Sequence, residues 1–107
     1  MDELAALIAA PDHHTLLFEN EHVRVLDTHI APGDTTPVHT HRWPAVLYVL
    51  SGEHFVRRDG EGKLLMDSRG GEALRAGAAW TERFPPHTLE NVGNSPIHVI
   101  AVELKQA

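Results

Sequence analysis

Short apolar segments follow one another along most of this chain, and each is ended by Gly, Pro or Asn. Runs of this kind separated by turn residues are typical of β-strands, and many of them in one chain predict an all-β sandwich or barrel. No helical period is present after residue 11, which argues against an alternating α/β layout. The segment Asp59-Gly60-Glu61-Gly62 predicts a hairpin. We expect strands over residues 15–19, 22–31, 45–50, 53–58, 63–67, 72–75, 79–84, 87–92 and 97–104.

The first ten residues have a different character. Alanine and leucine predominate from Asp2 to Ala10, and the segment predicts a short helix that Asp2 caps and Pro11 ends. Its apolar stretch is short and opens with two acidic residues, which argues against a secretory signal. We therefore divide the chain into an N-terminal helical extension, residues 1–12, and one β-barrel domain, residues 13–107.

Composition narrows the classes of function. The 107 residues carry a formal net charge of −6, which would repel a phosphate backbone, so nucleic-acid binding is not expected. No run is long enough for a membrane-spanning helix, and a cytoplasmic location is the expectation. The sequence has no cysteine, which excludes disulfides and metal sites built on sulfur. The basic doublet Arg57-Arg58 precedes two acids and is interpreted as a solvated strand end.

Two histidines two residues apart, His39 and His41, form the most specific chemical signal. On an extended segment such side chains point to the same face, and neutral imidazole is the commonest protein ligand for a transition metal. His87 would complete a three-nitrogen set if its strand crossed opposite the pair. With nine histidines in the chain, the alternative is a chance pair that is simply solvated. The others have no partner at ligand spacing and are interpreted as surface or locally hydrogen-bonded residues: His13, His14, His22, His29, His54 and His98.

Two motifs of the chain resemble those of the cupin superfamily. The first runs from Gly33 through His39, His41 and an apolar strand to Gly52, and the second runs from Gly77 through Trp80 and His87 to Asn91. The resemblance implies a small double-stranded β-helix, or jelly roll. It also implies that His39, His41 and His87 bind one divalent metal, which is iron, nickel, manganese or zinc. Asn91 would then support the site without being a ligand.

The first motif departs from the family pattern in one place. The glutamate that such proteins carry four or five residues after the second histidine is replaced here by Ala45 and Val46. Three explanations are open: three histidines hold the metal alone, another acid such as Glu82 replaces the glutamate, or the site binds no metal. A divalent ion on three neutral imidazoles keeps its full charge and open positions, which suits catalysis. In the second motif, Phe84-Pro85-Pro86 stiffens the approach to His87 without moving it.

Three side chains near the motifs are candidates for contact with a substrate. Trp43 lies two residues after His41 and is expected on the same face. Tyr48 points into the barrel if Val46 does, and a buried phenol needs a hydrogen-bond partner that substrate or water would supply. Arg42 offers a clamp for a substrate carboxylate, although a solvated loop arginine is the plainer interpretation.

The favoured function is a mononuclear metal-dependent enzyme acting on a small organic molecule. An iron-dependent dioxygenase with Tyr48 or Glu82 as the acid–base residue is the most concrete form, and an isomerase or lyase is equally compatible. The alternative is a non-catalytic cupin that binds or senses a small ligand, with or without metal. A homodimer is also expected, because the family resemblance implies it and because free strand edges need covering by the strand 15–19 or the N-terminal helix.

Overall fold

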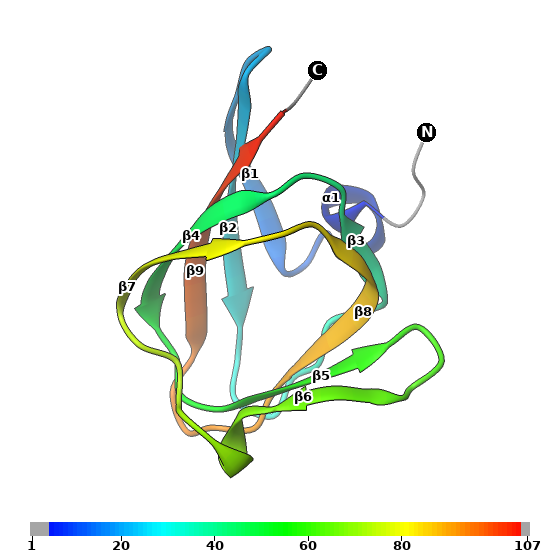
Figure 1. The fold of residues 1–107 in the computed structure, drawn as a ribbon, viewed down its shortest axis with the longest axis vertical. Coiled ribbons are helices and arrows are strands. Elements are labelled where there is room, and N and C mark those ends of the chain that lie inside the picture. Colours follow the sequence, from blue (N-terminus) through cyan, green and yellow to red (C-terminus); the bar gives the residue numbers. More distant parts are fainter. Residues whose placement is uncertain (1–4, 106–107) are drawn as a thin grey trace.

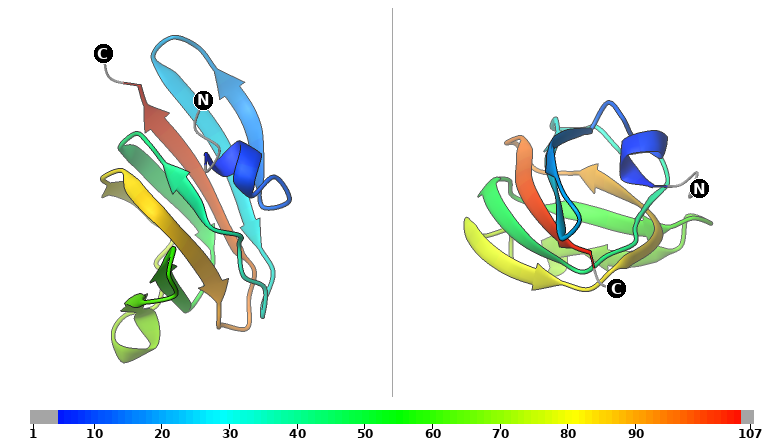
Figure 2. Two further views of the ribbon diagram at one scale, coloured as in Figure 1. Left: turned by 90° about the vertical axis from the view of Figure 1, so that its right-hand side faces the viewer. Right: turned by 90° about the horizontal axis from the view of Figure 1, so that it is seen from above.

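Two antiparallel β-sheets face each other and form the body of the protein (Figure 1). The computed structural model describes residues 5–105. The first sheet contains, in spatial order, β1 (His14–Glu19), β2 (Val23–Ile30), β9 (Ile97–Leu104), β4 (Ala45–Ser51) and β7 (Gly77–Thr81). The second contains β3 (His39–His41), β8 (Phe84–Asn91), β5 (Phe55–Asp59) and β6 (Leu64–Asp67). The sheets curve around a common interior (Figure 2), and the predicted all-β jelly roll is confirmed.

The central strands of the larger sheet supply much of the core. β2 and β9 pair without interruption, from Val23 opposite Leu104 to Ile30 opposite Ile97. Alternation along each strand sends every second side chain inward. Leu26, Ile30 and Ile97 are accordingly almost completely buried, and they build one wall of the interior.

The chain passes from one sheet to the other at two places that matter for the site. It leaves β3 of the smaller sheet, turns at Pro44 and enters β4 of the larger one. It returns between Thr81 of β7 and Phe84 of β8. The strand expected over residues 79–84 therefore ends early, because its last residue already belongs to the other sheet.

One expected strand, residues 72–75, is wrong. The segment is irregular and follows a short 3-10 helix, η1 (Ser68–Gly70). It connects β6 of one sheet to β7 of the other, so it crosses the edge of the barrel and does not extend either sheet. The hairpin expected at Asp59–Gly62 is present between β5 and β6, with Gly62 at φ +89° and the Asp59 carboxylate accepting from two turn amides.

The N-terminal helix, α1 (Ala6–Ala9), is shorter than the span expected from Asp2 to Ala10. Residues 2–4 of that span, with the expected cap Asp2, lie outside the described residues. α1 lies beside β1 and β3 (Figure 1). Ala6 is fully buried and packs with Leu26 and Ala101, so this helix contributes to the main core. Among the residues that the structure describes, no helix is long and apolar enough to cross a bilayer.

Candidate metal centre

Four histidines from three strands meet inside the barrel. His39 and His41 lie on β3, and His39 is paired with His87 on β8. His14, at the start of β1, comes from the facing sheet. Ligand atoms of His14, His39 and His41 lie within 4.8 Å of one another, and the His87 ring centre is 4.4 Å from that of His39. The rings of the three predicted ligands therefore lie close together, and His14 is a fourth imidazole beside them. The ligand atoms that meet within 4.8 Å are those of His14, His39 and His41, and this set does not include His87.

The chain holds each of these rings by its Nδ1 atom. Three of the rings bond to a backbone carbonyl and one to a carboxylate. The pairs are His14 with Ala10 O at 3.0 Å, His39 with Pro37 O at 2.8 Å, His87 with Pro85 O at 2.8 Å and His41 with Glu103 Oε2 at 3.2 Å. Carbonyl and carboxylate oxygens only accept, so Nδ1 carries the proton in every ring. Nε2 of each neutral ring is therefore left with its lone pair for a metal.

The local sequence explains these bonds. Pro37 and Pro85 each stand two residues before a histidine, and each leaves its carbonyl beside the ring that follows on the extended chain. Ala10, at the end of α1, does the same for His14. The Phe84-Pro85-Pro86 sequence that departs from the family pattern thus supplies the acceptor that orients His87.

Burial keeps three of these rings neutral. Desolvation, with a smaller contribution from the neighbouring histidines, lowers the pKa of His39 to about 3 against the opposing bond to Pro37. Desolvation likewise lowers the pKa of His14 to about 4 and that of His87 to about 4. A neutral imidazole is the form that binds a metal ion. Proton competition at these three rings is therefore absent at neutral pH.

A buried carboxylate stands directly behind the cluster. Glu103 of β9 is 0% exposed, and its Oε1 accepts from Arg24 Nε at 2.8 Å while its Oε2 accepts from His41. Burial alone would raise the pKa of Glu103, but the bonds from His41 and Arg24 outweigh it and hold the pKa below its ordinary value. A carboxylate that accepts from the outer nitrogen of a metal-ligating histidine fixes that ring and strengthens it as a ligand.

The histidines open onto a cavity of about 90 Å³ between the two sheets. Its wall is mostly apolar, and it includes Ile30, Leu47, Phe84, Leu89, Ile97 and Val99. Trp43 also lines the cavity, as expected from its spacing to His41. The polar lining of the cavity consists of the four histidines, Glu103, Arg57 and three threonines, Thr28, Thr36 and Thr81. The arrangement is a small apolar pocket with a nitrogen-rich end, which is the usual form of a small-molecule site.

The prediction that Tyr48 faces this cavity is wrong. Tyr48 is 51% exposed and lies on the outer face of β4, whereas Ala45 and Leu47 line the cavity. The error is one of parity. His39, His41, Trp43, Ala45 and Leu47 all line the cavity, so the alternation that begins at the histidines continues into β4 and places the even-numbered Val46 and Tyr48 on the outer face.

Glu82 and Arg42 are also outside the cavity. The Glu82 carboxylate accepts from the indole of Trp80, two residues before it, and both side chains are exposed. Arg42 is exposed and lies over the Trp43 ring at 4.8 Å, in agreement with the plainer interpretation. The second explanation for the missing glutamate, that Glu82 replaces it, therefore lacks a geometric basis.

The residues present fit a divalent transition metal. The converging imidazoles of His14, His39 and His41, with His87 beside them, form a suitable donor set for iron, nickel, manganese or zinc. Asn91 is not among the donors. It is fully buried, its amide nitrogen donates to the carbonyls of Ile30 and Ser95, and its oxygen accepts from Gly93 N. Its role is structural, as the resemblance implied.

Comparison with known proteins agrees with this architecture. A family model described as a cupin domain matches residues 26–103, so the chain belongs to the cupin family. No curated protein sequence matches the chain.

Solved structures resemble the chain over most of its length. A cupin domain from Bordetella pertussis is 20% identical with a TM-score of 0.71, covering 87% of this chain and 92% of that one. The polyketide cyclase RemF from Streptomyces resistomycificus is 20% identical with a TM-score of 0.60, covering 92% of this chain and 68% of that one. Bacillus subtilis oxalate decarboxylase, studied for its Mn(II) centres, is 17% identical with a TM-score of 0.55, covering 81% of this chain and 22% of that one. These identities establish a shared fold.

Proposed function

We propose that this protein is a mononuclear metal-dependent enzyme that acts on a small organic molecule, with dioxygenase-type chemistry as its most concrete form. The observation that carries the proposal is the set of four inward-facing imidazoles whose Nδ1 atoms are all held by oxygen acceptors. Surface histidines have no reason to share one tautomer and one direction. A metal site requires both.

The chain's own residues have defined parts in this proposal. His39, His41 and His87 would hold the ion as the family pattern implies, and His14 would take the place of the absent glutamate. When bound, a divalent ion supplies a Lewis acid, and iron in particular supplies a centre for dioxygen chemistry. Glu103 orients His41, and the apolar wall excludes bulk water from the pocket. These nitrogen ligands would leave a bound ion accessible to other molecules in the pocket.

The structural neighbours offer limited support. One is named for polyketide cyclisation and another for manganese centres in a decarboxylase, so the shared fold accommodates both metal sites and enzymes. Their low identity means that neither reaction transfers to this chain. Isomerase or lyase chemistry is compatible with the same ligands.

Elemental analysis of tag-free protein purified without chelator tests the proposal. We expect stoichiometric iron, nickel, manganese or zinc in the wild type and none in a His39→Ala/His87→Ala double variant. A His29→Ala/His98→Ala double variant is the matched control, because it removes two histidines outside the barrel and should keep the metal. Turnover of small organic compounds that disappears in His39→Ala and depends on one particular metal would establish the enzyme.

The alternative function is a cupin that binds or senses a small ligand without catalysis. The observation that favours it is the position of Tyr48 and Glu82, since both predicted acid–base residues point away from the cavity. If the wild-type protein holds no metal, even after reconstitution, the function would be that of a metal-free cupin that binds or senses a small ligand. A cytoplasmic location remains a prediction.

We also propose that two copies pair through the outer face of the larger sheet. Five apolar side chains form one in-register row across its five strands: Phe18, Val25, Val102, Val46 and Trp80. The row has no charged member, and Phe18 and Trp80 are each 54% exposed. Such a face can meet its own copy across a two-fold axis without burying like charges. Light scattering should give a dimer for the wild type and a monomer for Trp80→Glu, and a monomeric wild type would refute the pairing.

A further inference from the structure

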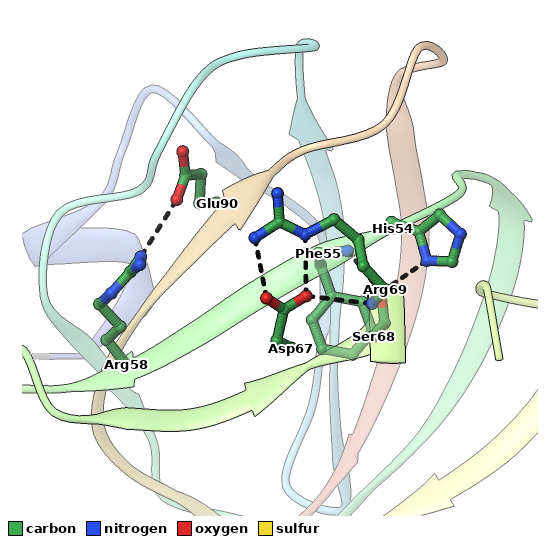
Figure 3. Close-up of polar contacts among 7 residues, drawn as sticks. All are labelled: His54, Phe55, Arg58, Asp67, Ser68, Arg69 and Glu90. Carbon is green, nitrogen blue, oxygen red and sulfur yellow. Dashed lines mark hydrogen bonds and ion pairs between the residues drawn. The ribbon is translucent and has the colours of Figure 1, made fainter. Parts of the chain in front are cut away.

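Arg57 is the one side chain of the cavity wall whose charge the site described so far leaves unexplained. The doublet Arg57-Arg58 was expected to be a solvated strand end, and for Arg57 this is wrong. Arg57 faces the interior from β5 and lines the same cavity as the histidines. Arg58, the next residue, points to the opposite face and donates to Glu90 at 3.1 Å (Figure 3).

The Arg57 guanidinium has no anionic partner among residues 5–105. Its Nε is buried without a hydrogen-bond acceptor. Glu103 is the one carboxylate on the described cavity wall, and its two oxygens already accept from Arg24 and His41. A buried N–H donor of a charged group that lacks an acceptor is costly. Desolvation accordingly lowers the pKa of Arg57.

Two aromatic rings hold this guanidinium in place. Its central carbon lies 4.6 Å from the centre of the Phe84 ring and 5.2 Å from that of Phe55. Contacts of this kind stabilise a cation over a ring face, but they do not satisfy its N–H groups. The Phe84 ring centre is in turn 5.0 Å from that of His87 and 6.0 Å from that of His41. Arg57 is therefore one aromatic ring away from the histidine cluster.

We propose that Arg57 is the substrate-binding residue of this pocket and that it selects a small organic anion, of which a carboxylate is the type. The planar fork of arginine matches a carboxylate through two parallel hydrogen bonds, one of which supplies the acceptor that Nε lacks. This assignment rests on the proposed function for the reaction at the histidines, but the anion site itself is made by Arg57. A ligand held there reaches toward the metal end of the pocket across Phe84.

The size and lining of the cavity narrow the ligand further. An engineered apolar cavity of about 150 Å³ holds benzene, whereas this one measures about 90 Å³. The enclosed part of a ligand is therefore a carboxylate with a few carbon atoms. The apolar wall favours a hydrocarbon body over a polyhydroxylated one.

The test uses the full chain, first freed of metal with a chelator and then reloaded with zinc. Acetate is the probe, and acetamide is its uncharged counterpart of nearly the same shape. NMR titration follows the Nε–Hε signal of Arg57 and gives both dissociation constants. We expect acetate to shift this signal in the metal-free protein and in the zinc-loaded protein. We also expect acetate to bind about tenfold or more tightly than acetamide.

Arg57→Met and Arg58→Met form a matched pair of variants. Arg57→Met should lose about tenfold or more in acetate affinity with unchanged zinc content, whereas Arg58→Met should bind acetate like the wild type. Arg57→Lys keeps the charge without the fork and should recover part of the loss. Should Arg57→Met not fold, the movement of the Arg57 signal in the wild type decides the question.

The outcomes separate this inference from the proposed function. Acetate affinity that is equal in Arg57→Met and the wild type, or an Arg57 signal that acetate does not move, would overturn the anion site even in zinc-loaded protein. Failure of the wild type to take up zinc or any other metal would contradict the proposed function. The metal-free titration would still decide for or against Arg57.

Discussion

Among residues 5–105, two histidine clusters each bring three ligating groups together, yet they differ in burial and in hydrogen bonding. The inner cluster, His14, His39, His41 and His87, lies inside the barrel. The outer cluster, Asp27, His29 and His98, lies on the solvent face of β2 and β9, and it too brings three ligating groups within 4.8 Å. His39 is 2% exposed, whereas the His29 side chain is 57% exposed.

The difference lies in which nitrogen is occupied. In the outer cluster both rings direct Nε2 at the same carboxylate. Nε2 of His98 lies 2.6 Å from Asp27 Oδ1, and Nε2 of His29 lies 3.3 Å from Asp27 Oδ2. Their rings stack at 3.9 Å. In the inner cluster the acceptors lie behind the rings, and Nε2 stays free. Proximity of ligating residues is therefore not enough for a metal site, since the supporting hydrogen bonds decide which lone pairs are available.

The largest effect should appear in the stability of metal-free protein. His14, His39 and His87 have folded pKa values of about 4, 3 and 4, while an unfolded histidine titrates near 6.5. Between these values the unfolded state binds more protons, so the free energy of unfolding falls as the pH is lowered. From pH 7.5 to 5 each ring should cost about 2 kcal/mol, or several kcal/mol together.

Urea unfolding of chelator-treated protein at several pH values measures this loss. A His87→Gln variant should lose about one third less of its stability over the same interval, because one of the three titrating rings is gone. Stability that does not change between pH 7.5 and 5 would mean that the inner rings are accessible to protons, and the contrast with the outer cluster would then disappear.

Removal of one ring from each cluster should give the next largest effect. His14→Ala takes away the proposed fourth ligand and should weaken zinc binding by about 100-fold or more, whereas His29→Ala should leave it unchanged. Competition with a chromophoric chelator measures both affinities. Equal zinc affinity in His14→Ala and the wild type would return the site to three histidines.

Much of the fold and part of this site were predictable from the sequence. Turn residues between short apolar runs predicted the all-β barrel, and the spacing of His39 and His41 with the later His87 predicted three of the converging rings. These predictions succeeded because they depend on local alternation and on motifs that stay on adjacent strands, such as the paired β3 and β8.

The remaining site residues depend on contacts between the two sheets. His14 and Glu103 reach the cluster from the facing sheet, and no spacing within the chain relates them to His39. The alternation that places Glu103 inward on β9 also places it opposite Arg24, yet the pairing of β9 with β2 is not visible in the sequence. Tyr48 was misplaced for a different reason. It was tied to Val46, whereas the alternation that starts at His39 and His41 places Ala45 and Leu47 inward and Tyr48 outward.

The carboxylate behind His41 should have a smaller effect than a ligand. Glu103→Gln keeps the shape of the side chain but removes the charge that orients the ring, and such changes typically cost about 10–100-fold in metal affinity. Asp27→Asn is the matched control in the outer cluster, where no change in zinc affinity is expected. Because Arg24 also loses its partner, the unfolding free energy of metal-free Glu103→Gln should be measured beside the affinity. A large loss of stability with unchanged zinc affinity would make Glu103 a structural residue.

The smallest effect is expected in the outer cluster itself. His29→Ala/His98→Ala removes one exposed ring and one half-buried ring, both bonded to Asp27 on the outer face, and surface pairs of this kind contribute about 0–1 kcal/mol. We expect the unfolding free energy at pH 7.5 to change by no more than that, and the metal content to stay as in the wild type. Loss of bound metal from this variant would show that the outer cluster binds an ion despite its occupied Nε2 atoms. The direction of the Nε2 lone pairs would then be a weaker criterion for a metal site than the proximity of the ligating groups. Burial would be the one remaining argument for metal binding at the inner cluster.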